Sequence, residues 1–236
     1  MTAMNLHRYP SPSGGFALGK MGAGATMLKQ GKTARDYVQS GLVAMWDGIE
    51  NAGWGVHDAS ATDWTNLVDG SGEATPYGAA WLDNAMTMDG NTSVFNIFDA
   101  SAVLNSHNFT IEVLVSRSVS YGAVFPGINA ADANSLYVYP WYGSRSGVYV
   151  YGSKVHSYIE GANKRHVVFT GDGTNILTYF DGSHDGTTTQ DTAITYTGKM
   201  YWRRGIIYAV RVYSRALTAD EIAHNYAIDK ERFNLP

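Results

Sequence analysis

The clearest strand pattern in the chain is carried by one stretch, Phe109-Thr110-Ile111-Glu112-Val113-Leu114-Val115-Ser116. From Phe109 onward, every second position is apolar, which is the period of a strand with one buried face. The run Val167 to Phe169 continues this pattern, and Gly171-Asp172-Gly173-Thr174-Asn175 then leads into Ile176-Leu177-Thr178-Tyr179-Phe180. A five-residue loop that contains Gly between two such runs predicts a β-hairpin.

Further short apolar runs, separated by turn residues, extend the pattern in both directions. One of them, residues 206–212, is apolar on both faces of the expected strand. The others lie near residues 42–46, 85–89, 94–98, 135–140 and 147–151. About ten closely spaced strands of this kind predict an all-β sandwich or jelly roll.

One helix is expected near the C-terminus, where Thr218-Ala219-Asp220-Glu221 has the form of a capping box. In this motif the Thr hydroxyl accepts the amide of Glu221, whose carboxylate reaches back to the amide of Thr218. Ile222 and Tyr226 then fall on the same side of the helix, so we expect it to pack against a sheet.

Five motifs, taken in order, resemble the laminin G-like, concanavalin A-like jelly-roll domains. They are Gly41-Leu42-Val43-Ala44-Met45-Trp46, Met86-Thr87-Met88-Asp89-Gly90, Asn108 to Val113, Arg165 to Phe169 followed by Tyr179 to Gly182, and Tyr208 to Ile222. The resemblance implies a two-sheet antiparallel jelly-roll sandwich with one short C-terminal helix. It also implies a recognition role, because members of this family bind glycans or proteins at sheet faces and rims, sometimes through calcium. One departure is Asn163-Lys164-Arg165, which replaces the Trp usual before the His-Val strand.

Charge is distributed unevenly along the chain, although the formal net charge is only −4. Residues 1–40 hold five bases and one acid, whereas residues 41–202 hold 6 bases and 16 acids. The N-terminal segment is also rich in Gly, Ser and Pro. We therefore expect residues 1–40 to be an extended basic arm or linker, and residues 41–236 to be the jelly-roll domain. Candidate assembly contacts in the arm are Arg8, Lys20, Lys29, Lys32 and Arg35.

Missing motifs argue against several kinds of catalytic site. None of the six Glu residues has an acid two positions later, so the Glu-x-Asp-x-x-Glu signature of retaining glucanases is absent. There is no Gly-x-Ser-x-Gly elbow, and a near match to a phosphate-binding loop at Gly14 to Lys20 lacks the Ser or Thr that holds magnesium. The chain has no Cys, and its seven His residues show no paired metal-ligand spacing, so His166 is expected to be a strand residue. The sequence therefore predicts a protein that is not an enzyme.

Calcium is the metal that the sequence leaves open. Carboxylate and amide oxygens, which calcium prefers as ligands, lie near the predicted turns. They belong to Asp58, Asp63, Asp69, Asp83, Asp89, Asn91, Asp99, Asp181 and Asp185. Because Asp and Asn are also the standard turn residues, we favour a turn role and keep a structural calcium as the alternative. No other cofactor is expected.

A hairpin rich in aromatic residues, between Leu136 and Tyr151, is the most informative feature for function. Aliphatic and aromatic residues alternate along its two runs, so one face can fill a core while the other carries rings. The aromatic positions are Tyr137, Tyr139, Trp141, Tyr142, Tyr149 and Tyr151. Tyr and Trp combine apolar area with a hydrogen-bonding tip, which suits stacking on a sugar. A subunit or partner interface, and packing beneath loops or the arm, are the alternatives.

Together these features predict a non-catalytic recognition or adhesion protein that binds a glycan or cell-surface receptor through the aromatic sheet face. The alternative is a structural or decoration (receptor-binding) protein of a bacteriophage virion, anchored by its N-terminal arm. Its partners would be other virion proteins, or a second copy of the chain, bound through the arm or the aromatic face. The net charge argues against nucleic acid, and no apolar run is long enough to span a membrane. No secretory signal is seen in the first thirty residues, and we expect the protein at an extracellular surface or on a virion.

Overall fold

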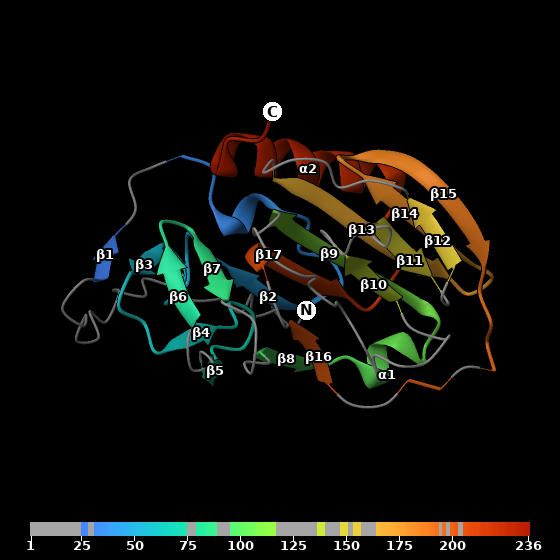
Figure 1. Cartoon of the computed structure of the whole chain (residues 1–236), viewed down its shortest axis with the longest axis horizontal. Helices are drawn as coiled ribbons and strands as arrows, with labels where there is room; N and C mark the ends of the chain where they lie inside the picture. Colours follow the sequence, from blue (N-terminus) through green and yellow to red (C-terminus); the bar gives the residue numbers. More distant parts are fainter. Residues whose placement is uncertain are drawn as a thin grey trace, which may run out of the picture.

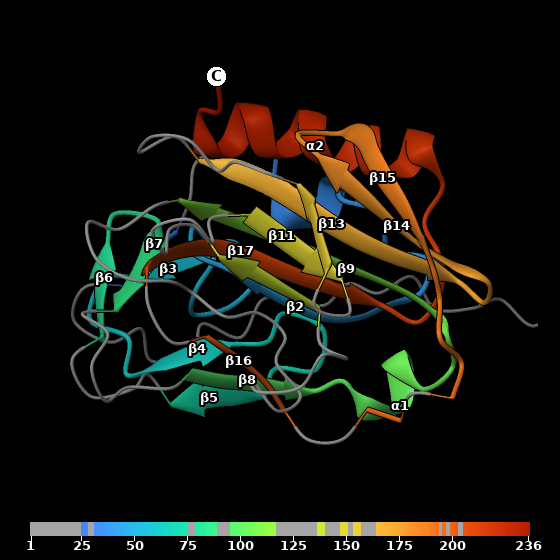
Figure 2. The same cartoon turned by 45° about the vertical axis from the view of Figure 1, so that its right-hand side comes forward.

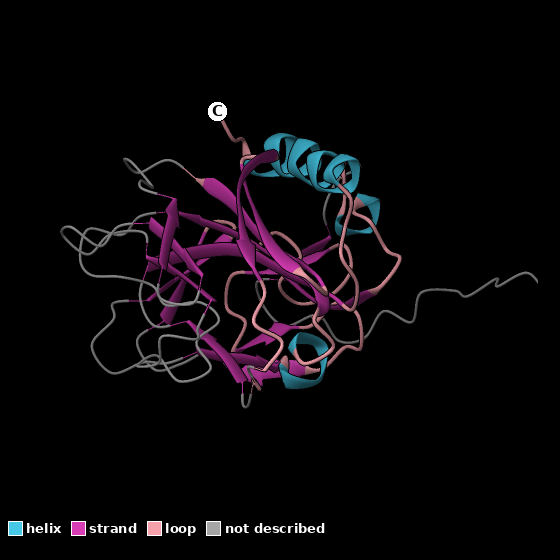
Figure 3. Ribbon diagram, turned by 90° about the vertical axis from the view of Figure 1, so that its right-hand side faces the viewer, coloured by secondary structure: helices cyan, strands magenta, loops and turns pink. Residues whose placement is uncertain are grey.

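The computed structural model is a β-sandwich with one long helix on its outer side (Figure 1). It describes residues 25–27, 31–74, 79–88, 95–116, 136–139, 147–150, 153–156, 164–193, 195–196, 199–202 and 205–236. Strands make up most of this part of the chain, as Figure 3 shows in magenta. The helical elements described are η1 (Ala34–Asp36), α1 (Ser101–Leu104) and α2 (Ala219–Phe233).

A large antiparallel sheet of eight strands forms the centre of the fold. Its spatial order is β15 (Ser183–Thr189), β14 (Asn175–Phe180), β13 (Arg165–Asp172), β9 (Asn108–Ser116), β17 (Gly205–Tyr213), β7 (Ala85–Met88) and β6 (Ala79–Leu82), with β2 (Leu42–Asp47) also paired to β17. The predicted hairpin is confirmed as β13 and β14, in which Val167 lies opposite Phe180. Strand β9 pairs with β13 on one side and with β17 on the other, so the predicted central strand is central in the sheet.

Smaller antiparallel sheets surround the large one. They are β1 (Ala25–Met27) with β3 (Val56–Asp58), β4 (Asp63–Thr65) with β5 (Gly72–Ala74), β8 (Phe95–Asp99) with β16 (Lys199–Trp202), and β10 (Leu136–Tyr139) with β11 (Gly147–Val150) and β12 (Ser153–His156). Figure 2 shows β4, β5, β8 and β16 on one side of the large sheet and α2 on the other. The predicted all-β sandwich with a C-terminal helix is therefore confirmed.

The main core lies on the inner side of the large sheet. It is built from Trp, Phe, Met and β-branched residues, including Trp46, Trp64, Phe109, Ile111 and Met200. The indole N–H of Trp64 donates to the backbone carbonyl of Asp47 at 3.1 Å, so this buried indole keeps its polar atom bonded. Each fully buried side chain of this size contributes roughly 1.5–3 kcal/mol through removal of apolar surface from water.

Helix α2 covers the outer side of the sheet and begins with the predicted capping box. The Glu221 N–H donates to Thr218 Oγ1 at 3.3 Å, and the Thr218 N–H donates to Glu221 Oε2 at 2.9 Å. Arg215 adds a two-point ion pair that lowers the pKa of Glu221 to about 2, together with the hydrogen bonds from Thr218. Ile222 is buried, as predicted, and joins Val168 in the packing between helix and sheet.

Because both sides of the sheet are covered, strand β9 differs from the half-buried strand that its alternation predicts. Every β9 residue after Asn108 is buried, including Thr110, Glu112 and Leu114. Leu114 packs under the C-terminal part of α2, with Phe233. The alternation identified the inner face correctly, but it could not reveal that a distant helix covers the outer face.

The folded unit also includes residues 33–40, which the sequence assigned to the arm. We call this segment the N-terminal strap. Ala34 and Tyr37 are buried, and the Val38 N–H donates to Asn225 Oδ1 of α2 at 2.9 Å. Thr33 caps η1 through a capping box with Asp36. The packed region therefore begins upstream of the expected boundary at residue 40.

Lys164, from the Asn163-Lys164-Arg165 stretch that leads into β13, bonds the C-terminal end of α2. Its Nζ donates to the Phe233 carbonyl at 2.6 Å and lies 4.8 Å from the ring centre of Tyr208. A cation at this end of a helix satisfies an otherwise unpaired carbonyl and interacts favourably with the helix dipole. The neighbouring Arg165 pairs with Asp181 at 2.6 Å. This stretch thus contributes two cations to contacts that fasten β13 to α2 and to the turn after β14.

We expect Lys164→Met to lower the free energy of unfolding by about 1 kcal/mol, because the Phe233 carbonyl loses a charged donor while the aliphatic stem is kept. Urea denaturation at constant m-value measures the change. Lys230→Met, at an exposed position on the same helix, is the control and should change stability by less than about 0.5 kcal/mol. Equal effects of the two substitutions would contradict a capping role for Lys164.

Candidate functional site

The predicted aromatic hairpin is present as the antiparallel pair β10–β11. Its register places Tyr137 opposite Tyr149 and Tyr139 opposite Gly147. The other three predicted positions, Trp141, Tyr142 and Tyr151, lie outside the described residues. The backbone therefore confirms that two predicted aromatic positions are direct cross-strand neighbours, which is the arrangement that a stacking surface requires.

The three-stranded sheet that contains this hairpin continues through β12, which lies beside β15 (Figure 1). Strand β15 is an edge of the large sheet and carries mostly small polar residues. Ser183, His184, Asp185, Thr187 and Thr189 are exposed on it. The expected binding surface thus adjoins a row of hydroxyl, imidazole and carboxylate groups that can form hydrogen bonds with a polar ligand.

Three of the acidic residues considered for calcium cap turns, whereas Asp181 pairs with Arg165. Asp58 accepts from Ser60, Asp69 from Ser71 and Asp99 from Ser101, each through the backbone N–H and the hydroxyl of the serine. These bonds lower the pKa of Asp58 and of Asp69. Among the described residues, no group of three His, Asp or Glu side chains could hold a metal ion. Asp89 and Asn91 lie outside that part of the chain.

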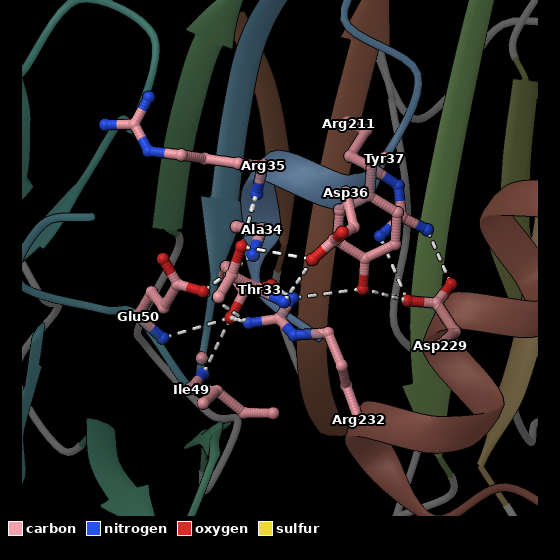
Figure 4. Close-up of polar contacts among 12 residues, drawn as sticks. Thr33, Ala34, Arg35, Asp36, Tyr37, Ile49, Glu50, Arg211, Asp229 and Arg232 are labelled. Atoms are coloured by element: carbon pink, nitrogen blue, oxygen red, sulfur yellow. Dashed lines mark hydrogen bonds and ion pairs between the residues drawn. The ribbon is translucent and has the colours of Figure 1, made fainter. Parts of the chain in front are cut away.

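Two of the five candidate arm residues are described, and both belong to the folded unit. Lys32 pairs with Asp36 at 3.8 Å on the surface. The Arg35 guanidinium lies 4.3 Å above the ring centre of Trp54 and points away from the interior (Figure 4). Arg8, Lys20 and Lys29 lie outside the described residues. Both described members thus make contacts within the folded unit.

The most unusual chemistry in the described part of the chain is a charged cluster buried between α2 and the large sheet. Arg211 of β17 donates through Nε to Glu112 of β9 at 2.6 Å, and through Nη1 and Nη2 to Asp229 of α2 at 3.0 and 2.6 Å. All three side chains are fully buried. Asn225 of α2 also donates to Glu112 at 2.9 Å, so that carboxylate joins two strands to the helix.

A second arginine extends this cluster towards the N-terminal strap (Figure 4). Arg232 of α2 pairs with Asp47 of β2 and with Glu50, whose Oε1 lies 2.9 Å from Arg232 Nη2. The Tyr37 hydroxyl lies between the two halves, because it donates to Asp229 at 2.6 Å and accepts from Arg232 at 3.1 Å. We call the whole set the buried network; it comprises Tyr37, Asp47, Glu50, Glu112, Arg211, Asn225, Asp229 and Arg232.

Burial and ion pairing shift the pKa values of Asp229 and Arg211 in opposite directions. Burial alone would raise the pKa of Asp229, but Arg211 and the Tyr37 hydroxyl hold it below its usual value. Burial alone would lower the pKa of Arg211, yet the two carboxylates raise it well above its usual value. Burial and Asp229 together raise the pKa of Tyr37 well above its usual range, so its hydroxyl stays protonated as a donor. At neutral pH the ion pair between Arg211 and Asp229 is therefore charged.

The sequence carried a signal for this network that the motif search did not use. Glu112 and Arg211 each interrupt an apolar strand, in Ile111-Glu112-Val113 and Val210-Arg211-Val212. A charge at the middle of a strand with both faces covered must be paired to be tolerated. Sequence alone does not show that the two strands are neighbours, in register, with Arg211 opposite Glu112.

The buried network has no access to a substrate in this structure, because Glu112, Arg211 and Asp229 are completely covered. His166 agrees with its predicted role as a strand residue: it lies in β13 and is fully buried against the same cluster. The network thus connects helix, sheet and N-terminal strap. In the described part of the chain, the main core lies on the inner side of the large sheet and α2 on its outer side.

These features define a lectin-type β-sandwich domain with a helix clamped on its outer face. The chain belongs to the concanavalin A-like lectin/glucanases superfamily: the Laminin_G_3 family matches residues 89–223, which is more than half of its length. The sequence-based resemblance is thereby confirmed. Comparison with curated protein sequences gives no significant match.

Solved structures with the same fold include proteins that act on or bind carbohydrates. Trypanosoma rangeli sialidase in complex with sialic acid superposes with a TM-score of 0.55 at 18% identity, over 81% of this chain and 33% of the sialidase. Domain 4 of AbnA, an extracellular arabinanase from Geobacillus stearothermophilus, in complex with arabinotriose, gives 0.52 at 14% identity, over 79% and 98%. The botulinum neurotoxin serotype D/C binding domain gives 0.54 at 8% identity, over 79% and 52%. This chain spans about a third of the sialidase chains, and at these identities the likeness establishes the fold alone.

In the described part of the chain, no helix is both long and apolar enough to cross a membrane. The longest helix described, α2, has charged residues on its buried side as well as on its exposed side.

We expect Arg211→Met to lower the free energy of unfolding by about 3–5 kcal/mol, because it leaves Glu112 and Asp229 buried without a counter-charge. Chemical denaturation followed by circular dichroism measures the change. The control is Arg215→Met, which removes the partly exposed pair with Glu221 and should cost at most about 1 kcal/mol. Similar losses of unfolding free energy for both substitutions would show that the buried ion pairs matter no more to stability than a partly exposed one.

Proposed function

We propose that this protein is a non-catalytic carbohydrate-recognition protein that binds glycans on the sheet β10–β11–β12. The observation that carries the proposal is the β10–β11 register, which sets Tyr137 directly opposite Tyr149 in a sheet separate from the large one. Rings at such positions can stack on the apolar face of a sugar. The remaining predicted contacts are Tyr139, Trp141, Tyr142 and Tyr151.

Two further observations support carbohydrate as the ligand class. The arabinanase domain is matched over almost its whole length, and its structure was determined with arabinotriose. The polar edge strand β15 lies beside β12 and offers exposed Thr187 and Asp185, which can bind sugar hydroxyls. The ligand would thus meet stacking groups and hydrogen-bonding groups side by side, as small-molecule sites require.

The absence of catalysis is part of the proposal. The glucanase carboxylate signature is missing from the sequence, and the buried Glu112, Asp229 and His166 are sealed from solvent. The chain matches only about a third of the sialidases, so their activity is not transferred to it. The bacteriophage virion role, anchored by the arm, remains a prediction from the sequence without support from the family or the structural neighbours.

We expect a glycan array, with sialylated and arabinan oligosaccharides as first probes, to identify a ligand. The affinity for this ligand should fall at least about tenfold in Tyr137→Ala and in Tyr149→Ala, which is equivalent to about 1.4 kcal/mol. Isothermal titration measures the affinity, and turnover of the same oligosaccharides should stay at background. Trp54→Ala, on a separate loop, is the control and should bind normally.

Two outcomes would contradict this function. Binding that is unaffected by either Tyr substitution would place the ligand elsewhere. A shift from dimer to monomer in sedimentation of Tyr137→Ala, with no glycan bound by the parent protein, would instead identify the aromatic hairpin as a subunit interface.

A further inference from the structure

His166 occupies a position that the glycan-binding proposal does not use. It lies in β13, directly beneath α2, and its ring stacks on Tyr226 with 5.8 Å between ring centres. Its Nε2 is 3.7 Å from Glu112 Oε1 and 3.7 Å from Asp229 Oδ2. Within the described part of the chain, neither ring nitrogen has a hydrogen-bond partner, and neither does Glu112 Oε1. The ring is fully buried.

The charged groups that face this ring come from every element packed against it. Strand β9 contributes Glu112, strand β17 contributes Arg211, and α2 contributes Asp229 and the Tyr226 ring. The turn after β14 contributes Asp181, which accepts the backbone N–H of His166 at 3.0 Å and is paired with Arg165. Arg211 bonds both neighbouring carboxylates, through Oε2 of Glu112 and through both oxygens of Asp229, and leaves Glu112 Oε1 without a partner.

We propose that protonation of the buried His166 ring at acidic pH loosens the packing of both α2 and the N-terminal strap against the sheet. An imidazolium must donate two hydrogen bonds. Here Nδ1 has no acceptor among the described residues, and the carboxylates lie 3.7 Å from Nε2, beyond hydrogen-bond distance. The buried cation gains proper solvation only if α2, which carries Asp229, moves away from the sheet.

Loosening of α2 also loosens the N-terminal strap, because α2 side chains hold the strap through hydrogen bonds. The Tyr37 hydroxyl donates to Asp229, the Val38 N–H donates to Asn225 at 2.9 Å, and His224 Nε2 lies 2.9 Å from the Asp36 carbonyl. All three partners on the helix side belong to α2. Acidification would therefore free the segment through which residues upstream of the sandwich are attached.

The direction of the pH dependence follows from the burial of the ring, which outweighs the two neighbouring carboxylates. Burial lowers the pKa of His166 below its usual value near 6.5, and Arg211 lowers it further, although Glu112 and Asp229 oppose the shift. Because the unfolded or opened chain then binds a proton more readily than the closed form, the closed form is favoured above about pH 6.5. That advantage is lost as the pH falls below 6.5 towards the lowered value.

Hydrogen exchange of the whole chain at pH 7.5 and pH 5.0, corrected for the intrinsic exchange rate at each pH, tests the proposal. We expect the protection of α2 and of residues 33–40 to fall at pH 5.0 by about tenfold for each unit by which burial lowers the pKa of His166, up to a limit of about 30-fold that is set by the interval between 6.5 and pH 5.0. His166→Gln, which cannot take up a proton, should remove this loss. His184→Gln, at an exposed position on β15, is the matched control and should behave as the parent protein does.

Titration of the His166 ring in the parent protein, followed by NMR, keeps the test independent of how well the variant folds. A midpoint at or above 6.5, or α2 protection that does not change between the two pH values, would overturn the proposal. A loss of protection that is confined to β10–β12 would also overturn it, because the proposal acts through α2 and the N-terminal strap. Neither experiment measures glycan affinity, so the result for His166 does not depend on whether the protein binds a glycan.

Discussion

The placement of α2 depends on one guanidinium group, that of Arg211. It lies at the centre of the outer face of the large sheet and is bonded to a carboxylate of the sheet, on Glu112, and to a carboxylate of the helix, on Asp229. Apolar contacts such as those of Ile222 and Phe233 hold α2 near the sheet but tolerate sliding. A planar fork with fixed donors does not tolerate it, so this ion pair sets the rotation and position of the helix.

The cost of burying these charges is offset only because each is satisfied by several partners. Replacing such a cluster by apolar residues is often neutral or stabilising. Its main contribution here is therefore to fix the orientation of α2 on the sheet, more than to add stability. It also makes the outer face sensitive to protonation, since His166 lies against the same carboxylates. The structural requirement for an ordered helix and the proposed response to acid thus have one physical origin.

The arrangement of layers also limits where recognition can take place. The inner side of the large sheet is filled by the main core, and its outer side is covered by α2 and the N-terminal strap. Edges and peripheral sheets remain, among them β15 and the sheet that contains the aromatic hairpin. This explains how a superfamily with a common sandwich can carry varied ligand sites without changing its core.

Much of the fold could be read from local chemistry. The alternation around Ile111, the Gly171–Asn175 turn and the Thr218–Glu221 capping box each specify their own element, because these signals act over a few residues. The same holds for the aromatic hairpin, whose two runs lie close together in the sequence and pair as expected.

The tertiary structure alone decided which distant residues meet. Glu112 and Arg211 are 99 positions apart, and Tyr37 and Asp229 are 192 apart, so no local pattern relates them. The charge count assigned residues 33–40 to an arm, yet burial of Ala34 and Tyr37 draws them into the domain. The physical reason is that pairing and burial of charges depend on the completed fold, whereas turns, caps and strand periodicity depend on neighbours along the chain.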